Sequence, residues 1–173
     1  MKKGGAFAQQ PPFKTTGIAG TKDEKMIIYF SVNLNKLVEF GRKYPWSKPK
    51  RCLNCNGCRI WGHGFVLAWF DGFNQAIEIK RCRCPDCKCV FRFRPKGFFK
   101  RFQADTATIR SSIFLKVQTG KWIPGISRTR QCHWFRTLLR KIRAYLTDTW
   151  DKGILDAFDE LVKLGLVPVS RSI

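Results

Sequence analysis

Residues 81–93, RCRCPDCKCVFRF, place four cysteines within eight positions and follow them at once with alternating phenylalanine and arginine. A second cysteine-rich stretch, RCLNCNGC, lies upstream at residues 51–58. Two Cys-x-x-Cys pairs separated by a hairpin-length insert are typical of a four-thiolate zinc site, because each pair forms a tight turn that points both sulfurs the same way. The sequence therefore predicts a small β-hairpin region held by one metal ion.

The ligands that this spacing favours are Cys52, Cys55, Cys84 and Cys87, with Zn2+ as the cofactor. Pro85 presets the second turn, and Gly57 or a small polar residue beside it allows the positive φ that follows the first turn. The insert of 28 residues contains two extended runs joined at Asp71-Gly72, a common hairpin pair. Because four thiolates close the coordination sphere, the expected role of the metal is structural.

The other cysteines leave the choice of ligands open. Cys58 could replace Cys52, and Cys82 or Cys89 could compete at the second turn. The spare thiols, Cys132 included, are expected to be small buried hydrophobes. An iron–sulfur cluster is an alternative, because the C-x-x-C-x-x-C pattern at 52–58 is ferredoxin-like, although the fourth-ligand pattern with proline is missing. A disulfide set would need an oxidising compartment, and nothing in the sequence indicates one.

Positive charge dominates the chain: Lys and Arg total 33 against 12 Asp and Glu, for a net charge of +21. Residues 80–147 alone hold 18 basic side chains, with Asp86 and Asp105 as the acids. Like charges repel, so this excess indicates a polyanionic partner. Nucleic acid is the first candidate and an anionic membrane surface the second. A merely solvated face usually mixes both signs of charge, and we therefore favour nucleic acid.

The first residues, MKKGGAFAQQPPF, contain lysines but not the apolar stretch of a secretory signal. No apolar run approaches the ~18 residues that cross a bilayer. We therefore expect a reducing, cytoplasmic location in association with the nucleoid, and no membrane partner.

Apolar spacing predicts the elements around the cysteine region. A short strand is expected at 26–32 and a helix at 33–46, with Asn33 as its N-cap. Further helices are expected at about 104–119, ending at Gly120, at 127–146 behind the N-cap Ser127, and at about 150–164, ending at Gly165. The predicted apolar faces of these three helices are Ile109, Ile113 and Val117; Cys132, Phe135, Leu139, Ile142 and Leu146; and Ile154, Leu155, Phe158, Leu161 and Val162.

Together these elements predict an α+β fold in which a small four-cysteine zinc-ribbon β-hairpin region is followed by a helix-turn-helix-like helical region. The expected organisation is a flexible tail at 1–25, a short strand and helix at 26–49, the zinc ribbon at 50–100, the helix-turn-helix-like DNA-binding region at 101–147 and an amphipathic C-terminal helix at 148–173. The connection between the two basic helices, TGKWIPGIS, is longer than the turn of a simple helix-turn-helix.

Basic side chains form one stripe of the 127–146 helix and one side of the strand after the second cysteine pair. An arginine-rich helix face fits the major groove of DNA, and free amides at a helix N-terminus favour phosphate. Alternation in FRFRPKGFFKRF, residues 91–102, predicts core phenylalanines and phosphate-facing cations, with base stacking on the phenylalanines as the alternative. The nucleic-acid-binding residues predicted on these grounds are Arg92, Arg94, Lys96, Lys100, Arg101, Arg128, Arg130, His133, Arg136, Arg140 and Arg143.

The stretches RCLNCNGCRIWGHGF, DGF and KRCRCPDCKCVFRFRPKGFF, with the basic two-helix segment after them, resemble the DNA-binding front end of bacterial insertion-sequence transposases and related small mobile-element proteins. In that family a zinc ribbon precedes a helix-turn-helix. The resemblance covers about residues 50–146 and implies a four-thiolate zinc site at Cys52, Cys55, Cys84 and Cys87, with sequence-directed DNA binding by the helices. The chain departs from the pattern where Cys82 stands at a usual aromatic position and Lys88-Cys89 replaces the usual glycine.

A transposase would also need a catalytic α/β domain with carboxylates after the binding region, and 26 residues follow Thr147. We therefore expect a non-catalytic, zinc-stabilised DNA-binding protein, of a mobile element or a transcriptional regulator. Its acidic C-terminal helix is expected to dock a protein partner or to close the core. The alternatives are an RNA-binding or ribonucleoprotein subunit and an accessory nuclease that uses His63 with a carboxylate.

Overall fold

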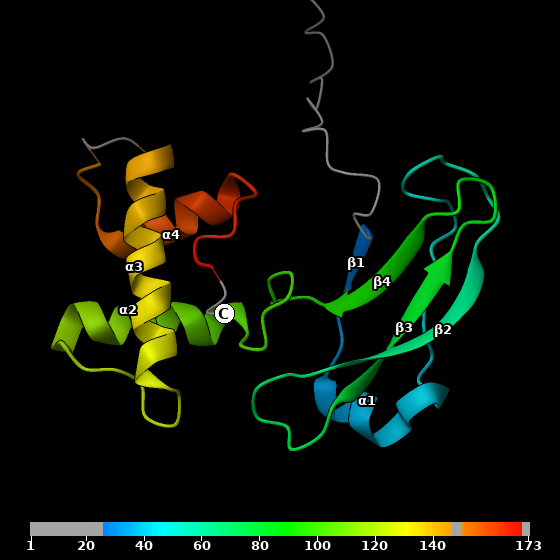
Figure 1. Cartoon of the computed structure of the whole chain (residues 1–173), viewed down its shortest axis with the longest axis horizontal. Coiled ribbons are helices and arrows are strands. Elements are labelled where there is room, and N and C mark those ends of the chain that lie inside the picture. Colours follow the sequence, from blue (N-terminus) through cyan, green and yellow to red (C-terminus); the bar gives the residue numbers. More distant parts are fainter. Residues whose placement is uncertain (1–25, 147–149, 171–173) are drawn as a thin grey trace, which may run out of the picture.

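The computed structural model describes residues 26–146 and 150–170, which form a four-stranded sheet and a separate group of helices (Figure 1). The strands are β1 (Met26–Phe30), β2 (Trp61–Ala68), β3 (Ile77–Arg83) and β4 (Val90–Pro95), and the helices are α1 (Leu34–Phe40), α2 (Thr106–Thr119), α3 (Arg128–Tyr145) and α4 (Ile154–Lys163), with a 3-10 turn, η1 (Gly41–Lys43), after α1. These elements confirm the α+β class. The predicted tail at 1–25 and the outer parts of the predicted 148–173 segment lie outside the described residues.

The sheet has the order β1-β4-β3-β2. β2, β3 and β4 are antiparallel neighbours, and β1 adds to β4 in parallel. The hairpin predicted around Asp71-Gly72 is formed by β2 and β3, and Gly72 adopts a φ of 85° in the connecting loop, which glycine does without strain. Because β2 and β4 start where β3 ends, both cysteine pairs lie at the same end of the sheet.

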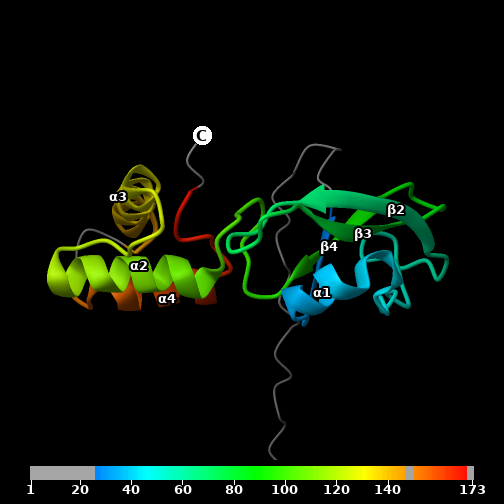
Figure 2. The same ribbon diagram turned by 90° about the horizontal axis from the view of Figure 1, so that it is seen from below.

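One face of the sheet forms a core with α1, in which Leu37, Phe91 and Phe93 are buried. Asn33 caps α1 as predicted, because its side-chain oxygen accepts a hydrogen bond from the Asn35 amide at 2.9 Å. The helix is shorter than the predicted 33–46, since it gives way at Gly41, whose φ is 51°, to the 3-10 turn. Figure 2 shows α1 beneath the strands.

The three later helices form a second core, and each of them contacts the other two. α3 runs across α2 rather than alongside it (Figures 1 and 2). Gly120 ends α2 in the left-handed conformation, with a φ of 72°, as predicted. α4 closes this core through Ala157, Phe158 and Leu161, which are buried. Arg110 of α2 holds it further with a pair of hydrogen bonds of 2.9 and 2.7 Å to the Asp159 carboxylate.

The bounds of α3 agree with the predicted 127–146, but its predicted buried face is wrong at the centre. The buried residues are Gln131, Trp134, Thr137 and Leu138, whereas Cys132, Phe135, Leu139, Ile142 and Leu146 are only half-buried. α3 packs against both α2 and α4, so a wide arc of its surface is buried. Two of the buried residues are polar, and a search for regularly spaced apolar residues therefore does not find this arc. On α2 the predicted Val117 is 42% exposed, which is also a correction.

Gln131 is the polar centre of the helical core. Its side-chain oxygen accepts hydrogen bonds from the Ser112 hydroxyl at 2.6 Å and from the Ile123 amide at 3.1 Å. Its amide nitrogen donates to the carbonyl oxygens of Ile123 at 2.9 Å and Ile126 at 2.8 Å. Four satisfied bonds make this burial tolerable and attach the α2–α3 connection to α3.

The sheet and the helices are joined by polar contacts at the β2–β3 loop. Asp71 in this loop forms an ion pair of 2.9 Å with Arg130 of α3, and its amide donates to the Gln103 carbonyl at 3.0 Å. The start of α3 is thereby fixed against the hairpin. No helix within residues 26–146 and 150–170 combines the length and the apolar character that crossing a membrane requires.

Candidate metal centre and basic helix surface

The first cysteine pair lies on a turn that is closed by its own backbone. The Cys52 amide donates to the Gly57 carbonyl at 2.8 Å, and the Asn56 amide donates to the Cys52 carbonyl at 2.9 Å. The amides of Asn54 and Cys55 both point at the Cys52 sulfur, each at 3.4 Å. Amides directed at a sulfur stabilise its thiolate form, which is the form that binds metal.

The second pair, Cys84 and Cys87, repeats this geometry. The Cys84 amide donates to the Cys89 carbonyl at 3.0 Å, five residues on, as Cys52 does to Gly57. In each turn the residue after the second cysteine has a positive φ, 58° at Asn56 and 61° at Lys88. At the first turn the positive φ therefore falls on Asn56, the small polar residue beside Gly57 that the sequence offered as the alternative. Lys88 takes it where the resembled pattern has glycine.

Gly57 lies close to the second turn, so a larger residue there would need the Asp86 side chain to move. A Cβ atom on Gly57 would lie 2.6 Å from a carboxylate oxygen of Asp86 and 3.4 Å from the Cys55 sulfur. Asp86 belongs to the second turn and forms an ion pair with Arg59, which follows the first. This ion pair bridges the two turns, and the cysteine spacing alone does not indicate it.

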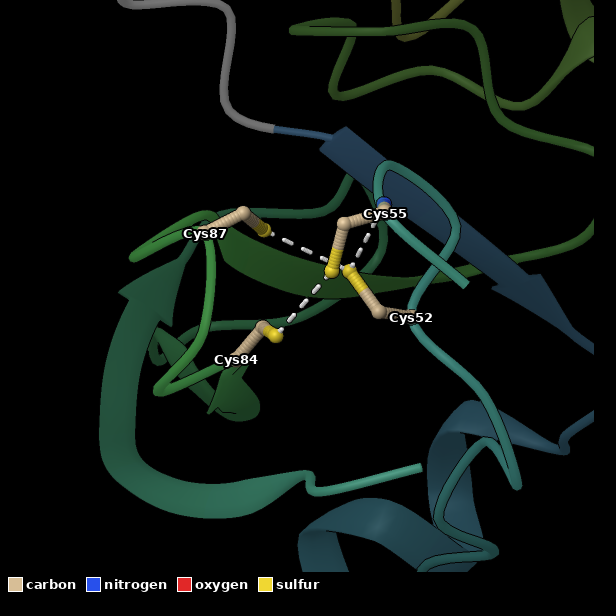
Figure 3. A group of neighbouring side chains, drawn as sticks. All are labelled: Cys52, Cys55, Cys84 and Cys87. Carbon is tan, nitrogen blue, oxygen red and sulfur yellow. Dashed lines mark hydrogen bonds between the residues drawn. The ribbon is translucent and has the colours of Figure 1, made fainter. Parts of the chain in front are cut away.

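The four predicted ligands converge into what we call the thiol cluster (Cys52, Cys55, Cys84 and Cys87). Their sulfurs all lie within 4.8 Å of one another and point toward a common centre (Figure 3). The Cys52 and Cys87 sulfurs are 3.5 Å apart, and those of Cys55 and Cys84 are 3.6 Å apart. A disulfide needs about 2.0 Å, whereas a tetrahedron with metal–sulfur bonds of about 2.3 Å needs sulfurs about 3.8 Å apart. The cluster can therefore hold a metal ion, and its all-sulfur donor set suits zinc.

The competing cysteines lie outside the cluster, which is the one group of potential metal ligands found among the described residues. Cys82 is fully buried in the sheet core, and this burial raises the pKa of its thiol. Cys58 is exposed beyond the first turn, and Cys89 is half-buried behind the second. His63, the proposed nuclease residue, belongs to no such group in the described part of the chain.

The cluster thiols share protons unequally. Asn54 and then the Cys89 backbone donate hydrogen bonds that lower the pKa of Cys87 to about 6. At Cys55 the Gly57 backbone lowers the pKa, but the hydrogen bond with Cys52, burial and the other cluster thiols raise it to about 12. Four adjacent thiolates repel one another, so full deprotonation needs a cation at their centre.

α3 presents the predicted arginine stripe (Arg136, Arg140 and Arg143) to solvent, since all three side chains are exposed. Arg128 is exposed at the start of the same helix. A shallow hollow of about 360 Å³ lies on this side of the helix, lined by Arg128, Thr129, Cys132, His133 and Arg136. This surface is positively charged and open, as contact with a polyanion requires.

Two predicted contact residues of α3 are engaged inside the protein. Arg130 pairs with Asp71 and lies over the Trp134 ring, with its guanidinium carbon 4.9 Å from the ring centroid. A His133 ring nitrogen lies 2.9 Å from the Ser170 hydroxyl, so the segment after α4 covers part of this histidine. Both residues are positioned by the fold before any ligand arrives.

Arg94 corrects the prediction of a solvent-facing basic side on β4. It is 7% exposed, and its guanidinium donates to the carbonyl oxygens of Phe98 and Phe102. It also lies over the rings of Phe70 and Phe98. Its role is to hold the segment between β4 and α2, which sequence alternation could not indicate. The predicted core positions Phe91 and Phe93 are buried, which removes base stacking on these two rings.

The remaining predicted contact residues lie around this segment with different degrees of exposure. Lys96 and Arg101 are exposed, Lys100 and Arg92 are half-buried, and Arg101 adopts a positive φ of 67°.

Comparison of the chain with protein-family models, with curated proteins and with solved structures finds no match. The chemistry of the site is therefore inferred from its own residues.

Proposed function

We propose that this protein is a non-catalytic, zinc-stabilised DNA-binding protein, of a mobile element or a transcriptional regulator. The observation that carries the proposal is the thiol cluster, in which four sulfurs from two distant turns lie within 4.8 Å of one another. A site with four thiolates leaves no open coordination position, so its zinc is structural. Cysteines that bind metal as thiolates require a reducing compartment, and a cytoplasmic, nucleoid-associated location is part of this proposal.

In this proposal zinc fixes the sheet end. The two turns that carry the cluster are loops with few buried side chains, apart from Cys52 and Cys84 themselves. Metal binding supplies the free energy that a hydrophobic core supplies elsewhere. The hairpin is thereby made rigid, and its loop holds the start of α3 through the ion pair between Asp71 and Arg130.

α2 and α3 act as the helix-turn-helix-like unit, with α3 as the helix that enters the major groove. An exposed arginine stripe opposite a buried face is the arrangement that groove binding uses. The connection between these helices is long, but Gln131 attaches it to the core by hydrogen bonds to Ile123 and Ile126. α3 is thus presented by a rigid support.

The test is binding of zinc-loaded protein to random-sequence duplex DNA, followed by selection of the bound sequences. Arg136→Gln with Arg140→Gln should weaken duplex binding at least tenfold at moderate salt, with an unchanged midpoint of thermal unfolding. The matched control is Lys36→Gln with Lys43→Gln, which removes the same charge from exposed positions on α1 and η1.

If both double variants lost duplex affinity equally, α3 would contribute only to the overall positive charge, which would contradict its role in recognition. An RNA competitor distinguishes the RNA-binding alternative from duplex binding. A ribonucleoprotein subunit bound to labelled duplex DNA would be displaced by a lower concentration of RNA than of unlabelled duplex DNA.

A further inference from the structure

On the side of the sheet opposite Cys82 and Phe91, charged and aromatic side chains gather at the end that carries the cysteine turns, whereas Ile79 and Arg94, further along the same side, are buried. β2 and β3 pair Trp61 with Arg83, and β3 and β4 pair Arg81 with Arg92. Directly paired residues project from the same face, and residues two apart on a strand share it. These four residues therefore lie together on what we call the basic sheet face (Trp61, Arg81, Arg83 and Arg92). The fully buried pair of Cys82 and Phe91 occupies the opposite face.

Among the described residues, the arginines of this face have no side-chain partners. Within residues 26–146 and 150–170 no side-chain hydrogen bond or ion pair holds Arg81, Arg83 or Arg92, and the Nε atom of Arg81 is buried without an acceptor. The acids Glu78 and Asp86 of the sheet region are paired elsewhere, with Arg42 and Arg59.

Two of these arginines also oppose each other. Like charges directly across a strand pair destabilise a sheet. Burial first, and then the charge of Arg81, lower the pKa of Arg92. A fold that places unpartnered cations face to face leaves a site for an anion, because a bound phosphate would satisfy the free donors and relieve the repulsion.

The aromatic member of the face determines which anion fits. Trp61 is 59% exposed, although a tryptophan usually buries most of its surface. An exposed indole ring beside Arg83 is a stacking platform for a nucleobase, whereas the bases of a duplex are already stacked on each other. The ligand that matches both features has phosphates and unpaired bases.

We propose that the basic sheet face binds an unpaired nucleic-acid strand, with a base stacked on Trp61 and phosphodiester groups held by Arg81, Arg83 and Arg92. This site is separate from the α3 surface in both its residues and its ligand. Single-stranded DNA and RNA share the required chemistry, and parallel measurements with the two distinguish them.

The test measures the affinity of the zinc-loaded full chain for labelled oligo(dT), oligo(U) and a duplex of equal length by fluorescence anisotropy. Trp61→Ala should weaken binding of the preferred single strand by between about 5-fold and 100-fold, and Trp61→Phe should retain most of it because stacking persists. Arg81→Gln with Arg83→Gln should weaken single-strand binding about tenfold. All three variants should bind the duplex within about twofold of the unsubstituted protein.

Two controls make the result decisive. Trp69→Ala removes another exposed indole, 55% exposed in the β2–β3 loop and outside this face, and should leave single-strand binding unchanged. Arg136→Gln with Arg140→Gln should reduce duplex binding alone. If the unsubstituted protein did not bind duplex DNA, the proposed function would be contradicted but this inference would stand. The inference is overturned if the unsubstituted protein does not bind single strands, or if the Trp61 and arginine variants bind them as the Trp69 variant does.

Discussion

At the scale of single residues, position in a turn decides what each cysteine can do. Eight cysteines lie in the sequence, and the four in the cluster are the ones whose turns repeat the same amide-to-carbonyl bond and positive φ. Cys58 follows the first turn, and Cys89 contributes its backbone carbonyl to the second turn but not its sulfur to the cluster. The spacing alone predicted the four ligands and left the alternatives open, because spacing does not show where a sulfur points.

Substitution of a cluster cysteine should therefore reduce zinc binding, whereas substitution of a neighbouring cysteine should not. Cys52→Ser removes one of four sulfur ligands and should lower zinc affinity by at least 10- to 100-fold, with partial unfolding of the sheet end. Cys58→Ser, the matched control, should keep one zinc per chain. Zinc content after dialysis against a weak chelator measures both. If the Cys58 variant lost zinc and the Cys52 variant kept it, Cys58 rather than Cys52 would be the zinc ligand, which would contradict the proposed set.

Zinc binding should also depend on pH. Cys55, whose pKa is raised to about 12, carries a proton at neutral pH in the metal-free protein, and zinc must displace it. Cys87, whose pKa is lowered to about 6, is then mostly a thiolate and becomes protonated only as the pH falls through that value. Apparent zinc affinity should therefore rise with pH above about 6 and fall more steeply below it. Competition with a chromophoric chelator across this range measures it, and a flat profile would exclude thiolate ligation.

At the scale of elements, the sequence predicted the start and end of α3 and the glycine that ends α2, but not how α3 is turned. Apolar spacing pointed to Cys132 and Leu139, whereas the structure buries Gln131 and Thr137 beside Trp134. A polar side chain is accepted in a core when tertiary partners satisfy it, and those partners are not visible in local sequence. The same reason explains Arg94, which alternation placed outside and hydrogen bonds to loop carbonyls hold inside.

The Gln131 network gives an element-scale prediction. Gln131→Leu fills a similar volume but leaves the Ile123 amide and two carbonyl groups unsatisfied, so it should lower the free energy of unfolding by about 3 kcal/mol. Gln118→Leu makes the same exchange at an exposed position of α2 and should change the stability by less than about 0.5 kcal/mol. Urea unfolding of both variants provides the comparison. Equal stabilities would show that the network contributes little.

At the scale of the whole molecule, the protein has two small hydrophobic cores and a large positive net charge. The sheet core and the helical core are built from different parts of the chain, and the ion pair between Asp71 and Arg130 connects them. A net charge of +21 opposes this compact arrangement through self-repulsion. A polyanion would reduce that repulsion, so binding should stabilise the fold as well as occupy its surface.

Duplex binding should consequently weaken steeply with salt. If Arg128 and the arginine stripe contact about four phosphates, the logarithm of the association constant should fall with the logarithm of salt concentration with a slope of roughly −3 to −4. Arg136→Gln with Arg140→Gln should bring this slope about two units closer to zero. Titrations at several salt concentrations measure it, and a slope near zero would contradict electrostatic binding by this surface.

The central claim is that four thiolates from the two turns hold one zinc ion in the native chain. The most direct measurement is the intact mass of the untagged protein under non-denaturing conditions, compared with its mass after acid denaturation. The account predicts the chain with one zinc ion and the loss of that ion in acid. A native chain without metal, or one whose mass shows its thiols oxidised to disulfides, would contradict it.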